Sequence, residues 1–164
     1  MTAPTPDTYD LSVVVPVKNE EANIAPLIGE ITAALRGRAR FEIVYVDDGS
    51  DDGTAEALRR ARHETPELRV VTHERCFGQS AGLFTGVRAA RAPWVATLDG
   101  DGQNDPADLP RLLDARDADP DPAAVALVAG QRLQRHDSAV KRLSSRVANG
   151  VRRRLLRDGA RDTG

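Results

Sequence analysis

The chain of 164 residues has the length of one domain, and 40% hydrophobic with 29% charged residues is typical of a globular protein. It contains no run near the roughly 18 apolar residues of a membrane-spanning helix. Its start lacks the basic and apolar segments of a signal peptide. A single cysteine, Cys76, excludes an internal disulfide and a multi-cysteine metal cluster, and we expect a packed thiol rather than a nucleophile. The net charge of −2 disfavours nucleic-acid binding.

Strand-like and helix-like patterns alternate along the chain after a Pro- and Thr-rich tail at residues 1–10, which we expect to be flexible. Short β-branched runs predict strands at residues 11–15, 41–46, 68–72, 94–98 and 125–129. Apolar residues at helical spacing predict helices that begin at Asn19 or Asn23, at Asp52 or Thr54, and at residues 79, 106 and 138. This alternation predicts an α/β three-layer sandwich around a mainly parallel central sheet.

Two acidic clusters, Asp47-Asp48 and Asp99-Gly100-Asp101, directly follow predicted strands. In parallel sheets, ligands gather at the carboxyl ends of the strands, so both clusters fall where a nucleotide would bind. By itself, Asp47-Asp48 fits a turn with a helix cap as well as it fits a contact with a ribose or a base.

The loop Asp99-Gly100-Asp101 has the composition of a cation–diphosphate site. Mg²⁺ and Mn²⁺ prefer oxygen ligands and usually take one or two carboxylates together with phosphate oxygens. A plain Asp/Gly turn is the alternative. An EF-hand is excluded, because Asn104 replaces its required glycine and Pro110 stands where its bidentate Glu belongs.

The sequence motifs of several other binding and catalytic sites are absent from the chain. The chain has neither a P-loop nor a Gly-x-Gly-x-x-Gly sequence, and no Ser/His/Asp nucleophile arrangement is evident. We expect the three histidines to be exposed or structural.

A basic segment ends the chain, with ten Lys and Arg between residues 132 and 161. Its apolar residues from 140 to 155 form a helical stripe. Three interpretations stay open: a solvated helix face, a nucleic-acid contact, which the lack of aromatic residues disfavours, and an interfacial helix attracted to anionic lipid.

Six segments together resemble family 2 glycosyltransferases, specifically the polyprenyl-phosphate branch typified by dolichol-phosphate mannose synthase. They are residues 13–21, 46–54, 77–81, 98–106, 128–132 and 141–146. The resemblance implies a Rossmann-like GT-A fold over residues 11–137 and an acceptor region with a basic amphipathic helix at residues 138–164. It also implies that relatives continue beyond Gly164.

The resemblance assigns roles to residues of this chain. The nucleotide-sugar pocket would be lined by Pro16, Lys18, Glu20, Val46, Asp48, Asp99 and Gly100. The metal, Mg²⁺ or Mn²⁺, would be held by Asp99, Asp101 and Gln103. The catalytic residues would be Asp101 and Arg132. The acceptor phosphate would meet Lys141, Arg142, Ser145 and Arg146.

The implied activity is inverting transfer of a hexose of the mannose or glucose type from a GDP- or UDP-sugar to a polyprenyl phosphate. The implied location is the cytoplasmic face of a membrane, with which the protein would associate peripherally. Nucleic acid is not an implied partner. Two alternatives stay open: a family 2 transferase with a hydroxyl acceptor in cell-envelope glycan synthesis, and an inactive nucleotide-binding fragment.

Overall fold

A computed structural model of the chain describes residues 9–130. The chain divides into two compact units, residues 1–124 and residues 125–164. The described part of the first unit, residues 9–124, contains the sheet and all the helices discussed below.

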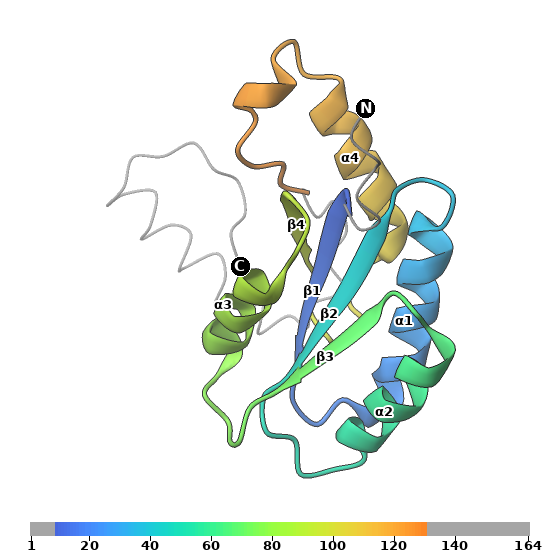
Figure 1. Cartoon of the computed structure of the whole chain (residues 1–164), viewed down its shortest axis with the longest axis vertical. Helices are drawn as coiled ribbons and strands as arrows, with labels where there is room; N and C mark the ends of the chain where they lie inside the picture. Colours follow the sequence, from blue (N-terminus) through green and yellow to red (C-terminus); the bar gives the residue numbers. More distant parts are fainter. Residues whose placement is uncertain (1–8, 131–164) are drawn as a thin grey trace, which may run out of the picture. The chain divides into compact units, whose positions relative to one another are not determined.

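The centre of the first unit is a four-stranded sheet in which every pairing is parallel. Its strands are β1 (Leu11–Val17), β2 (Phe41–Asp47), β3 (Leu68–Thr72) and β4 (Trp94–Thr97). The strand order is β3-β2-β1-β4, as Figure 1 shows. The change of direction between β1 and β4 is the place where such sheets bind ligands.

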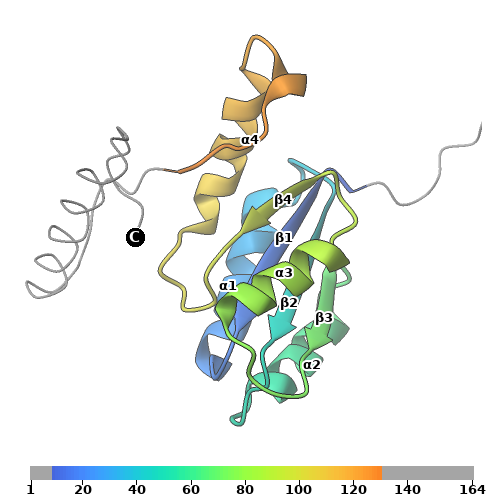
Figure 2. The ribbon, with the colours of Figure 1, turned by 90° about the vertical axis from the view of Figure 1, so that its left-hand side faces the viewer.

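Helices cover both faces of the sheet. They are α1 (Glu21–Leu35), α2 (Thr54–Glu64), α3 (Gln79–Ala89) and α4 (Leu109–Asp117), with short 3-10 turns η1 (Pro106–Asp108) and η2 (Pro122–Ala124). α1 and α2 lie on one face and α3 on the other (Figures 1 and 2). The predicted three-layer α/β sandwich with a parallel sheet is therefore confirmed.

Each face buries the apolar residues that the sequence pattern indicated. The predicted stripe of α1 is buried in full and consists of Ile24, Leu27, Ile28, Ile31 and Leu35. On the other face, α3 approaches closely through Gly82 and Gly86: a Cβ on Gly86 would lie only 2.3 Å from Val14 Cγ1. The recurring glycines thus serve helix-to-sheet packing.

β1 is longer than predicted, because it continues through Pro16 to Val17. A proline in a central strand loses one ladder hydrogen bond. In β1, however, the register with β4 ends at Val14, and Leu98 N donates to Val14 O at 3.1 Å just beyond it. The missing N–H of Pro16 therefore falls on the side where β4 has ended.

Three helix starts differ from the predictions. α1 begins at Glu21, and neither predicted Asn caps it: Asn19 has a positive φ of 59°, and Asn23 lies inside the helix. α2 has Gly53 at its N-cap, although Asp52 accepts a hydrogen bond from Thr54 N at 2.9 Å. The helix predicted from residue 106 begins as the 3-10 turn η1 and becomes α-helical only in α4.

The predicted strand at residues 125–129 is wrong, because residues 125–130 have no regular secondary structure. Leu127, in the middle of this run, is 80% exposed. A β-branched, apolar composition favours a strand only where a neighbouring strand is present to pair with it.

Among the described residues, no helix has the length and apolar character needed to cross a bilayer.

Candidate functional site

The loops after β1, β2 and β4 meet at the carboxyl edge of the sheet. The loop after β2 is fastened to β1, because Asp48 N donates to Val17 O at 2.9 Å. The loop after β4 approaches β1 as well, because a Cβ on Gly100 would lie 2.3 Å from Val17 Cγ1 and 3.1 Å from Pro16 O. The structure therefore brings both acidic clusters to one edge, as the topology predicted.

The acidic loop is exposed and is held by short polar contacts. Asp99 Oδ1 accepts a hydrogen bond from Gln79 Nε2 at 2.7 Å, which ties the loop to the first residue of α3. Asp101 Oδ1 accepts from Gln103 N at 3.0 Å and closes a tight turn around Gly102, whose φ is +71°. Both aspartates face solvent at the loop surface.

The predicted metal ligands fit a hard divalent cation by their chemistry. Asp99, Asp101 and Gln103 are all exposed and offer two carboxylates and one amide oxygen. A carboxylate has about four lone-pair sites, so the bonds just described leave acceptor capacity for a cation. Within residues 9–130 there is no cluster of three or more His, Cys, Asp or Glu arranged for a metal. Phosphate oxygens and water would therefore complete the coordination, as is usual for Mg²⁺.

Asp48 is buried, with only 4% exposure, and its carboxylate is bonded to the loop that joins β3 to α3. It accepts from Phe77 N at 2.9 Å, Gly78 N at 2.7 Å and Cys76 Sγ at 3.2 Å. Its Oδ1 also lies 2.7 Å from His73 Nδ1. We call this arrangement the Asp48 clasp.

The environment of Asp48 favours its ionised form. Burial alone would raise the pKa of this carboxyl, but the hydrogen bonds from His73, the loop N–H groups and Cys76 outweigh burial and hold the pKa well below its usual range. His73 extends the clasp to α3, because its Nε2 lies 2.9 Å from Thr85 Oγ1.

The loop after β1 places Lys18 and Glu20 differently from each other. Lys18 is exposed, and its Nζ donates to Gly49 O at 2.9 Å, so its ammonium group lies at the carboxyl edge beside the loop after β2. Glu20 is half-buried and accepts from Asn23 Nδ2 at 2.6 Å. Glu20 is one of the residues that line a groove between α1 and α2.

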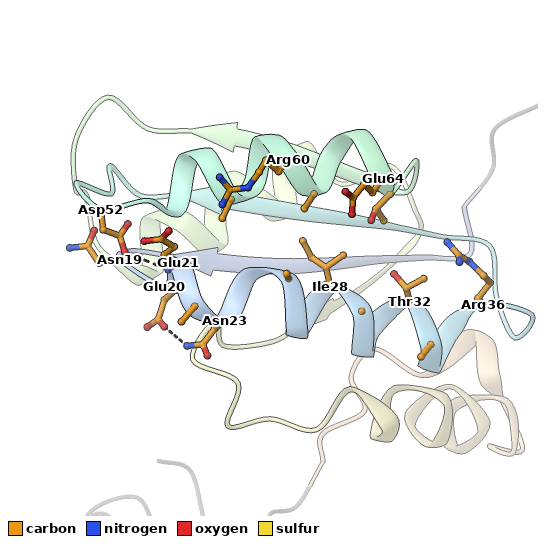
Figure 3. Close-up of a pocket in the computed structure, with 17 residues that line it drawn as sticks. Asn19, Glu20, Glu21, Asn23, Ile28, Thr32, Arg36, Asp52, Arg60 and Glu64 are labelled. Atoms are coloured by element: carbon orange, nitrogen blue, oxygen red, sulfur yellow. Dashed lines mark hydrogen bonds between the residues drawn. The ribbon is translucent and has the colours of Figure 1, made fainter.

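That groove, drawn in Figure 3, has a volume of about 1070 Å³. Polar side chains of Asn19, Glu20 and Asp52 lie at one end, while Arg36 and Glu64 lie at the other. Of the residues predicted to bind nucleotide or metal, only Glu20 lines it. The groove is therefore separate from the acidic loop.

Pro16 and Val46 lie beneath α3. Pro16 is buried, and a Cβ on Gly82 would lie 2.9 Å from its Cβ. Val46 has no exposed surface and packs below Gly86. A direct contact between Val46 and a nucleotide would require α3 to shift, and that contact stays a prediction.

The remaining predicted site residues lie outside the described residues. They are Arg132, Lys141, Arg142, Ser145 and Arg146. Their roles stay predictions.

The structure adds partners that sequence reasoning did not assign to the site. Gln79 holds Asp99, and His73 joins Asp48 to Thr85. The expectation that His73 is structural fits these bonds. The expectation that Cys76 is packed is wrong, because Cys76 is exposed, although its Sγ donates to Asp48 Oδ2 at 3.2 Å. The family resemblance at residues 77–81 indicated this region but did not reveal its hydrogen-bond partners.

Comparison with known proteins identifies the family. The model for glycosyl transferase family 2 matches residues 12–161. Dodecaprenyl-phosphate galacturonate synthase from Rhizobium johnstonii is 38% identical over 148 residues, which are 87% of this chain and 42% of that protein. Undecaprenyl-phosphate 4-deoxy-4-formamido-L-arabinose transferase from Edwardsiella ictaluri is 38% identical over 157 residues, 94% of this chain and 46% of that protein.

A solved structure supports the same assignment. The mannosyltransferase PcManGT from Pyrobaculum calidifontis, in complex with GDP-Man and Mn²⁺, superposes with a TM-score of 0.61 and 30% identity. The match covers 70% of this chain and 34% of that chain. The predicted GT-A fold is thereby confirmed. The chain spans less than half the length of each of these relatives. By the family match over most of its length, the chain belongs to glycosyl transferase family 2.

Proposed function

We propose that the chain carries the donor-binding part of an inverting glycosyltransferase that uses a nucleotide sugar, a divalent cation and a polyprenyl-phosphate acceptor. The observation that carries the proposal is the pair of exposed aspartates in loop 99–101 at the carboxyl edge, a loop that is tied to α3 by Gln79 and packed against β1 at Gly100. Two relatives named for polyprenyl-phosphate substrates and a neighbour with bound GDP-Man and Mn²⁺ support it.

The donor diphosphate would lie against the exposed surface of loop 99–101, which packs close to β1 because Gly100 has no side chain. Asp99, Asp101 and Gln103 would hold Mg²⁺ or Mn²⁺, which neutralises charge on the departing nucleoside diphosphate. Lys18, at the same edge, adds a positive charge that favours an anionic donor.

Inversion requires the acceptor to attack from the face of the sugar opposite the diphosphate. A phosphate monoester has a second pKa of about 6 and is largely dianionic near neutral pH, so it attacks without a general base. A hydroxyl acceptor would need such a base. The proposed roles of Arg132, Lys141, Arg142, Ser145 and Arg146 are to face the donor and acceptor phosphates.

The transferred sugar is proposed to be a hexose, of the mannose or glucose type. The two curated relatives are named for galacturonate and for a formamido-arabinose, so a donor panel has to include acidic and amino sugars. The proposed place of action is the cytoplasmic face of a membrane, where a polyprenyl phosphate is anchored.

The test is donor binding by calorimetry and sugar transfer to undecaprenyl phosphate, with and without Mn²⁺ or Mg²⁺. We expect Asp101→Ala to weaken metal-dependent donor binding at least about tenfold, since losing even an outer partner of a metal commonly costs that much. Asp108→Ala is the matched control, because it removes another exposed carboxylate, seven residues further along the chain in η1.

Three outcomes separate the alternatives. Equal donor binding by both variants would refute the assignment of the metal site. Transfer to a sugar or protein hydroxyl instead of the lipid phosphate would favour the hydroxyl-acceptor alternative. Donor binding without any transfer would favour the inactive nucleotide-binding fragment.

A further inference from the structure

The outer face of α3 exposes large apolar side chains. Phe84 is 66% exposed and Val87 is 47% exposed, and Phe77, just before the helix, is 54% exposed. Figure 2 shows α3 in front of the sheet, with its outer side turned away from the strands. Clustered exposed apolar side chains mark an interaction surface more often than scattered ones do.

The same face is positively charged. The guanidinium carbon of Arg88 lies 5.9 Å from the ring centre of Phe84, and that of Arg75 lies 5.0 Å from the ring centre of Phe77. Residues 75–98 contain three arginines and no Asp or Glu, although the whole chain has 25 acidic residues. Positive charge and aromatic surface are therefore combined on the helix, while the exposed Glu74 lies next to Arg75 in the loop before it.

The loop that carries Arg75 and Phe77 is fastened to α3 through His73. The ring of Phe77 meets the ring of His73 edge-on, with 5.4 Å between their centres. His73 in turn bonds Thr85, the neighbour of Phe84 on α3. The loop before α3 and the middle of α3 are thus joined through His73.

We propose that this face docks on a membrane that contains anionic lipid. The α3 surface, as we name it, consists of Arg75, Phe77, Phe84, Val87 and Arg88. Apolar and aromatic side chains enter the boundary between headgroups and acyl chains, while guanidinium groups pair with lipid phosphates. The choice of a lipid surface over a protein partner rests on the proposed function, in which the acceptor is a membrane lipid.

The position of the α3 surface suits that role. Gln79, the first residue of α3, donates to Asp99 at 2.7 Å, so the helix begins at the acidic loop. A bilayer against α3 would lie beside this loop and would present a lipid-borne phosphate close to the donor. The basic residues after Arg132 are a separate candidate for lipid contact, and the test has to distinguish the two.

The test is co-sedimentation of the 164-residue chain with phosphatidylcholine vesicles, with and without phosphatidylglycerol. A basic residue near an anionic surface contributes about a fivefold change in partitioning, so Arg75→Gln/Arg88→Gln should weaken binding about 30-fold. Phe84→Ser/Val87→Ser should weaken binding to both kinds of vesicle. Both pairs are exposed, and thermal melting checks that each variant is folded.

The matched control is Arg60→Gln/Arg62→Gln on α2, which removes the same charge from exposed positions on the other face of the sheet. We expect this control to change vesicle binding much less than the α3 pairs. Equal losses in all pairs, or no loss in the α3 pairs, would overturn the proposal. Donor binding measured without vesicles separates this failure from a failure of the proposed function.

Discussion

A buried ion pair holds the amino end of the sheet, and its removal tests how much this chain depends on it. Glu42 in β2 is completely buried and accepts hydrogen bonds from Arg69 Nη1, Ser12 Oγ and Arg91 N, each at 2.7 Å. Arg69 is the only charged partner among these three donors. We predict that Arg69→Met strongly destabilises the fold.

The magnitude follows from the burial of the carboxylate. The side chain of Arg69 is 30% exposed and that of Glu42 is not exposed at all, so the substitution leaves an unpaired charge inside the protein. Breaking such a pair costs about 3–5 kcal/mol, a large share of the roughly 5–15 kcal/mol that stabilises a typical domain. The expected fall in melting temperature is about 10–20 °C.

The pH dependence gives this prediction its sharpest test. Burial alone would raise the pKa of Glu42, but the bonds from Arg69, Ser12 and Arg91 outweigh burial and lower it. In the native chain, the contribution of Glu42 is therefore present above about pH 4.3 and is lost as the pH falls through the lowered pKa. In Arg69→Met, burial should dominate and raise the pKa, so the deficit of the variant should shrink as the pH approaches about 4.

The assay is urea denaturation at neutral and mildly acidic pH, followed by circular dichroism. Arg38→Met is the matched control, since Arg38 pairs with Asp114 at 2.9 Å on the surface, with side chains 54% and 66% exposed. It should cost less than about 1 kcal/mol. A deficit for Arg69→Met that equals this control, or that does not change with pH, would refute the reasoning.

Two further predictions concern the packing of α3 and the Asp48 clasp. Gly86→Ala should destabilise the domain by about 1–3 kcal/mol, because its Cβ would meet Val14 Cγ1 at 2.3 Å. Gly29→Ala on α1 has nothing within 4 Å of its Cβ and should stabilise the domain by about 0.5–1 kcal/mol. Thermal melts measure both changes. Asp48→Asn should speed hydrogen exchange at the Phe77 amide, and unchanged exchange there would contradict the clasp. The stability that ionised Asp48 contributes should be present above about pH 4 and be lost as the pH falls through its lowered pKa.

The layers of the fold could be predicted from the sequence because their signals are local. The helical spacing from Ile24 to Leu35 and the β-branched run from Leu11 depend only on which residues must face a core. The strand predicted at residues 125–129 was wrong because strand formation depends on a pairing partner, which local composition does not specify. The extent of β1 was missed for a related reason: Pro16 is tolerated only because β4 ends before it.

The candidate site was predictable in position but not in bonding. Parallel topology alone places Asp48 and Asp99 at one edge, since both follow strands of the same sheet. Apart from Asn104, which is five residues from Asp99, the partners of these carboxylates are 20 to 30 residues away in sequence, and no spacing rule reveals them. The same holds for Glu42, whose partner Arg69 is 27 residues away.

The hydrogen bonds also indicate different roles for the two acidic clusters, although both have the same place in the sequence pattern, directly after a strand. A carboxylate that accepts several internal hydrogen bonds has little capacity left for a ligand, so Asp48 is better placed to fix the loop from His73 to Gly78 than to bind a nucleotide. Asp101 is exposed and accepts one local bond, so it retains the capacity that a cation needs. Because that loop leads directly into Gln79, which holds Asp99, the buried cluster positions the exposed one. Loosening of the clasp should therefore weaken donor binding, measured by calorimetry, through the position of Gln79 and Asp99, while the contact of Asp48 itself with the nucleotide stays a prediction.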